Sequence, residues 1–198
     1  MGLIRKYNEF VSKHKLFAFR EVLLFMIITL AIHYAYRYWA QDLRYAPVPK
    51  TMFMLEEHMT QTLYVHSKWI IIRIPFLDII YVDDAERVIG FASNGYTGIN
   101  HSCSGFKQML QLILLFLLYP GPWKHKLWYI PMGVVVIYIV NVIRIVTLCI
   151  VMNYNPGYFE FTHDYIVRPF FYIVIFALWV IWVEKVYTRR IKGEDIQT

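Results

Sequence analysis

The sequence predicts an all-α polytopic membrane protein with about four transmembrane helices and a small extracytoplasmic insertion of helix and strand. Of its 198 residues, 58% are hydrophobic and 18% are aromatic. A soluble domain is closer to half apolar, and aromatic side chains are abundant at membrane interfaces. At this length we expect a single integral membrane domain over residues 1–198, with the insertion at about 40–102 and the remaining core at about 103–186.

Four apolar segments are the candidate transmembrane helices. They lie at about 21–38, 105–119, 127–152 and 169–186, and Pro169 suits the first position of the last helix. The second segment is short, because its 15 residues rise only ~22 Å against a hydrocarbon core of ~30 Å. Either its outer end is recessed beneath the membrane surface or the bilayer thins locally. Recession would place the residues just before it in a sheltered pocket.

The positions of the basic residues predict the sidedness of the protein. Cytoplasmic loops of membrane proteins are enriched in Lys and Arg. Four spans bring the N-terminal tail, the 120–126 loop and the C-terminal tail to one side. We therefore expect a multi-pass protein of the inner (cytoplasmic) membrane, with both termini in the cytoplasm and residues 40–104 and 153–168 outside. The basic residues concerned are Arg5, Lys6, Lys13, Lys15, Lys124, Lys126, Arg189, Arg190 and Lys192.

The long outer loop carries its own signals for local structure. Apolar residues at positions 52, 55, 59 and 63 predict a helix over about 51–66, lying on the membrane surface or packed on the bundle. The β-branched segment 69–74 predicts a strand, and 87–91 is a second candidate. Asn94-Gly95 is a hairpin turn signal. A small sheet leading into Cys103 is therefore expected.

A charge within the third apolar segment is the clearest functional signal in the chain. Arg144 is the one formally charged residue between positions 127 and 152. A charge at membrane depth costs at least ~2.5–3.5 kcal/mol, so such a residue usually faces the bundle interior and serves function. The alternative is that Arg144, roughly 12 Å from the end of the segment, extends its side chain to the interface.

The predicted topology brings Cys103 and His163 to the same outer half of the membrane as Arg144. Cys103 stands at the outer end of the second segment, and His163 lies in the outer loop shortly before the last one. A cation or imidazole beside a cysteine lowers the pKa of the thiol and activates the thiolate nucleophile. The arginine could instead stabilise an oxyanion, and the histidine could act as general base and then general acid. These are the parts of a thiol acyl-transferase or peptidase.

Each of these residues also has a purely structural explanation. Cys103 could be an inert, small hydrophobic residue. Asn141 and Arg144 could hold helices together, and His163 could be an interfacial loop residue. His101 is a rival for the base, because in an extended strand it would point to the same face as Cys103.

Other classes of site have little support in the sequence. The histidines at 66, 101 and 163 show no recognised metal-ligand spacing, so we expect no metal and no cofactor. The basic residues cluster at span ends without the pattern of a nucleic-acid groove, so we expect no nucleic-acid partner. Two cysteines do not make a disulfide framework, and Cys149 is expected to pack within the third segment.

The combination of motifs resembles the exosortase/archaeosortase family of membrane transpeptidases, and in particular its short, compact variants. The resemblance covers roughly residues 90–185. It rests on Cys103-Ser104-Gly105 opening a span, on Asn141-x-x-Arg144 within the next long span, and on His163 before the last span.

The resemblance implies a cysteine protease or transpeptidase whose site faces outward. Family members are thought to recognise exported proteins by a C-terminal tripartite signal, made of a short motif, an apolar helix and a basic tail. They cleave near the motif and transfer the product to a lipid or cell-surface acceptor. On this interpretation the catalytic core spans about 103–186, with Cys103 as nucleophile, Arg144 stabilising the thiolate or oxyanion, and His163 as general acid/base.

Three further residues are expected to support the site. Asn141, one helical turn from Arg144, would orient it. Ser104 and Gly105, at the start of the second span, could offer backbone N–H groups to an anion. The alternative function is a non-catalytic membrane assembly factor, or a small anion transporter that uses Arg144 as its binding site.

Overall fold

The computed structural model describes residues 16–187. The basic tails on either side, which contribute to the predicted sidedness, lie outside the described residues. In chain order the elements are α2 (Leu16–Arg37), a π-helix (Tyr38–Asp42), α3 (Pro49–Ile71), β1 (Ile79–Asp83), β2 (Val88–Phe91), β3 (Tyr96–Gly98), a 3-10 turn (His101–Cys103), α4 (Phe106–Leu118), α5 (Trp123–Tyr154), a 3-10 turn (Pro156–Tyr158), α6 (Phe159–Phe161), a π-helix (Thr162–Val167), α7 (Arg168–Trp182) and a π-helix (Val183–Tyr187).

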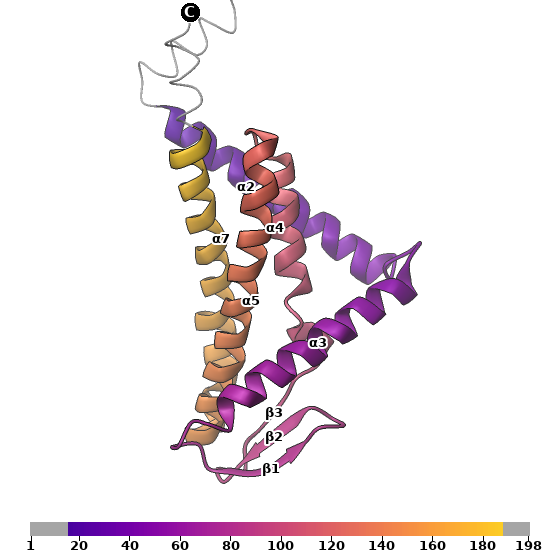
Figure 1. The fold of residues 1–198 in the computed structure, drawn as a ribbon, viewed down its shortest axis with the longest axis vertical. Helices are drawn as coiled ribbons and strands as arrows, with labels where there is room; N and C mark the ends of the chain where they lie inside the picture. The colour runs from indigo at the N-terminus through magenta and orange to yellow at the C-terminus, as the bar shows by residue number, and fades with distance from the viewer. Residues whose placement is uncertain (1–15, 188–198) are drawn as a thin grey trace, which may run out of the picture.

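A bundle of α4, α5 and α7 forms the body of the molecule, while α2 and α3 cross it obliquely (Figure 1). The buried rings of Phe116, Tyr129 and Trp182, one from each bundle helix, meet with centroids 5.1–5.6 Å apart. Aromatic pairs at this spacing add stabilisation beyond the area that they bury. This cluster fixes the three helices that position the candidate site.

Within residues 16–187, three helical segments are long and apolar enough to cross a membrane, at 19–42, 123–154 and 156–186. The sequence predicted four spans; the remaining one corresponds to α4, which has 13 residues and rises only ~20 Å. In Figure 1, α4 runs beside one half of α5 and begins partway along it. The segment that contains Cys103 therefore lies beside the middle of the bundle.

The connection from α4 to α5 is closely tied to the bundle. Lys126 Nζ donates to the carbonyl oxygens of Leu117 and Tyr119, at 3.0 and 2.7 Å, which satisfies carbonyls that the end of α4 leaves open. Trp182 Nε1 donates to the Pro120 carbonyl at 3.2 Å. These contacts hold α4 antiparallel to α5 and set the height at which α4 begins.

The predicted helix at 51–66 is present but longer than expected, because α3 continues to Ile71. The predicted strand at 69–74 is therefore wrong. Local β-branched composition favours a strand, but Ile71 is fully buried against the bundle, and this packing extends the helix. The helix ends shortly before Pro75, whose ring disfavours helical conformation in the preceding residue.

A three-stranded antiparallel sheet, in the order β1-β2-β3, follows α3. β2 occupies the predicted 87–91 segment. The predicted turn is also present, with Asn94 at φ 61° and the Phe91 N–H donating to the Gly95 carbonyl at 2.9 Å. β1 was not predicted. β3 ends at Gly98, so the sheet leads directly into the Cys103 turn, as the sequence suggested.

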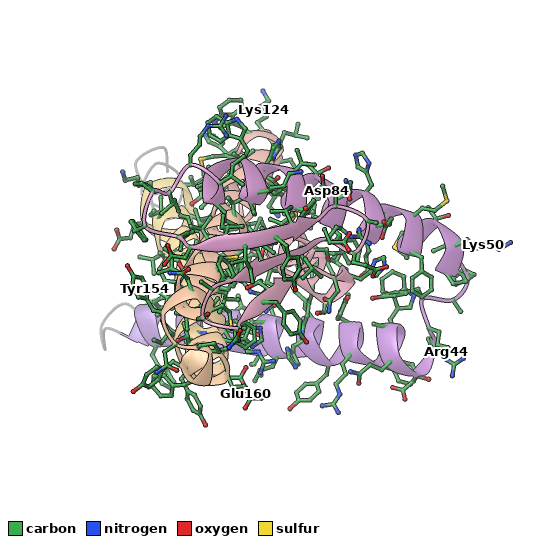
Figure 2. The ribbon with its side chains drawn as sticks, turned by 90° about the horizontal axis from the view of Figure 1, so that it is seen from below. Arg44, Lys50, Asp84, Lys124, Tyr154 and Glu160 are labelled. Atoms are coloured by element: carbon green, nitrogen blue, oxygen red, sulfur yellow. The ribbon has the colours of Figure 1, made fainter. Side chains whose placement is uncertain are left out.

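Polar contacts join the sheet to α3. Asp84 accepts hydrogen bonds from Lys68 Nζ at 2.7 Å and from the Tyr64 hydroxyl. The Lys68 and Tyr64 hydrogen bonds hold the pKa of the Asp84 carboxyl below its usual value. Figure 2 views the molecule from the sheet end, with Asp84 beside α3 and the α2–α3 connection turning between Arg44 and Lys50.

His163 does not lie in a loop, contrary to the sequence prediction. It belongs to a π-helical segment that continues without a break from α6 into α7. Polar residues at 162–164 suggested a loop, but Thr162 and Val167 are buried, and this packing keeps the segment helical. Single π-helical turns within α-helices are frequent at functional sites.

Candidate functional site

Cys103 closes a tight turn immediately before α4. Its backbone N–H donates to the Asn100 carbonyl at 2.9 Å, and Asn100 Oδ1 accepts from the Ser102 N–H at 3.1 Å. The resulting 3-10 turn replaces the extended strand on which His101 and Cys103 would have shared a face. The Cys103 side chain is partly buried and packs against an apolar cluster that includes Ile145.

The two sequence motifs meet through Gly105 and Asn141. Asn141 is fully buried, and its Nδ2 donates to the Cys103 carbonyl at 2.8 Å. Gly105 has φ +77°, and a Cβ there would lie 2.7 Å from Asn141 Nδ2. A glycine is required both for this backbone conformation and for the close approach. Asn141 was expected to orient Arg144; its Nδ2 instead donates to the Cys103 backbone.

Ser104 contributes to the start of α4. Its N–H donates to the His101 carbonyl at 3.1 Å, and its hydroxyl accepts from the Phe106 N–H at 3.2 Å. The Ser104 N–H is thus already engaged, rather than free for an anion as anticipated. The side chain is buried, so its hydroxyl acts as a local cap for the helix.

Arg144 faces the bundle interior, one turn after Asn141 on α5. Only 9% of its surface is exposed. Its Nη2 lies 2.9 Å from His163 Nε2, and its guanidinium carbon is 5.9 Å from the centre of the Phe171 ring. Among the described residues its buried Nε has no hydrogen-bond partner, and a negative charge on the Cys103 thiol would interact favourably with it. The geometry therefore favours the interior position over the interfacial one.

His163 is held on three sides. Besides Arg144, its Nδ1 lies 2.7 Å from Asp164 Oδ1. Its ring stacks on Phe159, with centroids 5.8 Å apart and an interplanar angle of 7°. Asp164 also pairs with Arg168, at 3.3 Å. The imidazole thus bridges a carboxylate and a guanidinium.

A cavity of about 140 Å³ opens beside these groups. It is large enough to admit several atoms of a ligand, and it combines polar and apolar walls. Residues before α4, within α4, in α5 and at the start of α7 contribute to it. Its lining residues are Ser102, Gln108, Arg144, His163, Val167, Arg168 and Phe171.

Sequence reasoning assigned no role to Gln108, Asp164 or Arg168. Gln108 carried a usable signal, because it stands with Lys107 in the polar first turn of a mostly apolar helix. Asp164 and Arg168 lie in the segment interpreted as a loop. Asp164 follows His163 directly in the sequence, but only the helical conformation shows that its carboxylate contacts the imidazole and that Arg168 contacts that carboxylate.

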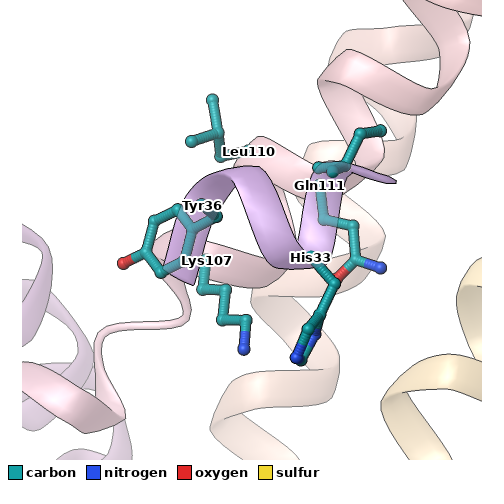
Figure 3. A pocket seen from close by; sticks show the side chains of 6 residues that line it. His33, Tyr36, Lys107, Leu110 and Gln111 are labelled. Atoms are coloured by element: carbon teal, nitrogen blue, oxygen red, sulfur yellow. The ribbon is translucent and has the colours of Figure 1, made fainter. Parts of the chain in front are cut away.

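Three other histidines lie in different surroundings. His101 Nε2 is 3.2 Å from Glu57 Oε2 on α3, so this rival for the base has a partner away from Arg144. His66 Nδ1 lies 2.6 Å from the Tyr138 hydroxyl. His33 lines a shallow depression between α2 and α4, together with Gln111 (Figure 3). Cys149 is fully buried, as expected.

The arrangement can support acyl transfer through a thiol. It combines a partly exposed cysteine at a helix start, a buried cation, and an imidazole with a carboxylate partner beside a cavity. Nucleophile, base and orienting group are the components of covalent catalysis. The histidine, cysteine and carboxylate side chains within residues 16–187 form no group of three or more that could hold a metal ion.

The sequence model for the transmembrane exosortases matches residues 16–181, a longer stretch than the motifs alone had suggested. No curated protein and no solved structure gave a match. The family match spans well over half of the chain, from α2 through most of α7, and the chain belongs to the transmembrane exosortase family.

Proposed function

We propose that this protein is a membrane-embedded cysteine transpeptidase or protease. It cleaves a C-terminal sorting signal of exported proteins at the extracytoplasmic face and transfers the product to a lipid or cell-surface acceptor. One observation carries the proposal most strongly: Arg144 and His163, 19 positions apart, make a 2.9 Å contact next to the turn that presents Cys103. Family membership supports the same reaction class.

The proposed reaction proceeds in two acyl transfers. His163 Nε2 takes the proton of the Cys103 thiol, and Sγ attacks the carbonyl carbon of the scissile peptide. Arg144 stabilises the oxyanion as it forms. The C–N bond then breaks, the amine leaves with the proton from Nε2, and a thioester remains on Cys103. A hydroxyl, amine or water then attacks the thioester carbonyl carbon while His163 Nε2 removes its proton. The C–S bond breaks, and the departing Cys103 thiolate takes that proton from Nε2, which restores the thiol and the neutral imidazole.

The proposed orientation uses α4 as a short fourth crossing. In Figure 1 the start of α2, the end of α4, the start of α5 and the end of α7 lie toward one end, opposite the sheet. Lys124 and Lys126 belong to that end, which we assign to the cytoplasm by the excess of basic residues. The insertion at 40–102 and the site would then face outward.

One observation also supports a second candidate. The Nε of Arg144, which has no hydrogen-bond partner within residues 16–187, lies beside the cavity and could bind a small anion in a transporter. The two functions depend differently on the thiol: a transporter needs Arg144 but not Cys103, whereas a transpeptidase needs both.

The test compares processing of an exported protein that carries a C-terminal tripartite signal, expressed in the same cells as each variant. Cys103→Ala should abolish processing at unchanged membrane levels. Cys149→Ala is the matched control, because this second cysteine is buried away from the cavity, and it should retain activity. Full processing by Cys103→Ala would reject the proposed function.

A further inference from the structure

Asp164 contacts the proposed base, His163, at the ring nitrogen that Arg144 does not contact. Its Oδ1 lies 2.7 Å from His163 Nδ1. Side chains at positions i and i+1 of an α-helix do not normally face each other. The π-helical turn makes this contact accessible, because more residues per turn reduce the angle between consecutive side chains. Arg168, 3.3 Å from the same oxygen, holds Asp164 in place.

The two neighbours of His163 require the same imidazole tautomer. A guanidinium has only donors, so Nε2 must accept the hydrogen bond from Arg144. An ionised carboxylate has only acceptors, so Nδ1 must carry a proton and donate it to Asp164. The Asp164 contact requires a proton on Nδ1, and the Arg144 contact excludes one from Nε2. Together they lead to a neutral ring with its proton on Nδ1 and its lone pair on Nε2.

We propose that Asp164 is a positioning residue that holds His163 in this tautomer, and that Arg144 occupies the basic Nε2 until substrate arrives. The inference rests on the proposed function and deepens it. A carboxylate on Nδ1 orients the ring and stabilises the imidazolium that forms when Nε2 accepts a proton. Asp164 itself touches neither the thiol nor the substrate.

In the resting site, Arg144 occupies the ring nitrogen that would otherwise act as the base. While its Nη2 donates to Nε2, the lone pair of the base is not available to the Cys103 thiol. The carbonyl oxygen of a bound peptide is a competing acceptor for the guanidinium. The Nε, which has no partner in the described part of the chain, can also donate to it. When the Arg144 guanidinium moves from Nε2 to this oxygen, Nε2 becomes free to act as the base. The same movement places the guanidinium where it can stabilise the oxyanion.

Asp164→Asn separates these roles. An asparagine can rotate its amide so that the NH₂ group donates to Nδ1, which moves the imidazole proton to Nε2. In that tautomer Nε2 has no lone pair, so it can accept neither the thiol proton nor the hydrogen bond from Arg144. We expect processing to fall by at least ~10²-fold, the lower end of what a general base contributes. Asp164→Glu, which keeps the carboxylate, should restore part of the activity.

The control is Glu160→Gln, which removes another exposed acid from the same helical segment. It has no hydrogen bond to His163 in the described structure and should process normally. The discriminating readout is ¹⁵N NMR of histidine-labelled protein, with His163→Gln used to assign the signal. Wild-type protein should show Nδ1 protonated and Nε2 unprotonated, and Asp164→Asn should show protonated Nε2.

The outcomes separate this inference from the proposed function. Normal processing by Asp164→Asn, or protonated Nε2 in neutral resting wild-type His163, would overturn the positioning role even if Cys103→Ala is inactive. The wild-type spectrum keeps the inference testable if Asp164→Asn fails to accumulate. Processing by Cys103→Ala would instead remove the reaction on which the inference rests.

Discussion

Gly105→Ala tests the coupling between the two motifs. Alanine at φ +77° costs about 1–2 kcal/mol, because its Cβ crowds the carbonyl in the left-handed region. The new Cβ would also lie 2.7 Å from Asn141 Nδ2, so Asn141 must withdraw from the Cys103 carbonyl. Losing a buried hydrogen bond costs about 1–3 kcal/mol. We expect a total destabilisation of about 2–5 kcal/mol.

The assay is a double-mutant cycle on detergent-solubilised protein, with unfolding followed by circular dichroism. In the Asn141→Ala background the side chain that meets the new Cβ is absent, so Gly105→Ala should cost only the backbone strain. A coupling of about 1–3 kcal/mol is expected for such a contact. Gly98→Ala is the matched control, because its Cβ would meet Val88 at a comfortable 3.7 Å. Additive effects of the two substitutions would refute the steric lock between the motifs.

Three other predictions follow from the arrangement of charges and histidines. In a cysteine-free background, a cysteine introduced at Asp83 should react with an impermeant thiol reagent from outside and one at Lys124 should not; the reverse would invert the proposed orientation. His163→Ala should reduce processing by ~10²–10⁴-fold, whereas His101→Ala should retain most activity; an essential His101 would move the base. The low pKa of Asp84 means that its ionised form stabilises the fold at neutral pH, and this contribution should disappear as the pH falls below about 4. Thermal unfolding at several pH values checks this, and an equal pH dependence in Asp84→Asn would contradict it.

The membrane core was largely predictable, because apolar length and periodicity determine where a chain can satisfy its backbone within lipid. The third apolar segment became α5, and Arg144 faces the interior, as the cost of a charge in lipid implies. Cys103-Ser104-Gly105 could be placed beside Asn141 only by resemblance. Position 105 is a glycine because its backbone approaches Asn141 closely, and only the three-dimensional structure shows this approach.

The errors have a common physical origin in tertiary packing. The segment at 69–74 has strand-like composition, but burial of Ile71 makes its first part helical. His163 stands among polar residues typical of a loop, yet buried Thr162 and Val167 keep it in a π-helix. Asp164 was missed for the same reason. Whether its side chain contacts the ring of the preceding His163 depends on the type of helical turn, which the sequence did not predict.

The most direct test of the central claim is to isolate the covalent intermediate. Membranes that contain the protein and an exported target would be quenched during processing, and peptides containing Cys103 would be analysed by mass spectrometry. The account predicts a target fragment joined to Cys103 through a thioester that hydroxylamine releases, and its absence in Cys103→Ala. A processed target with no adduct on Cys103 under conditions that slow the second transfer, or an adduct on Cys149, would contradict it.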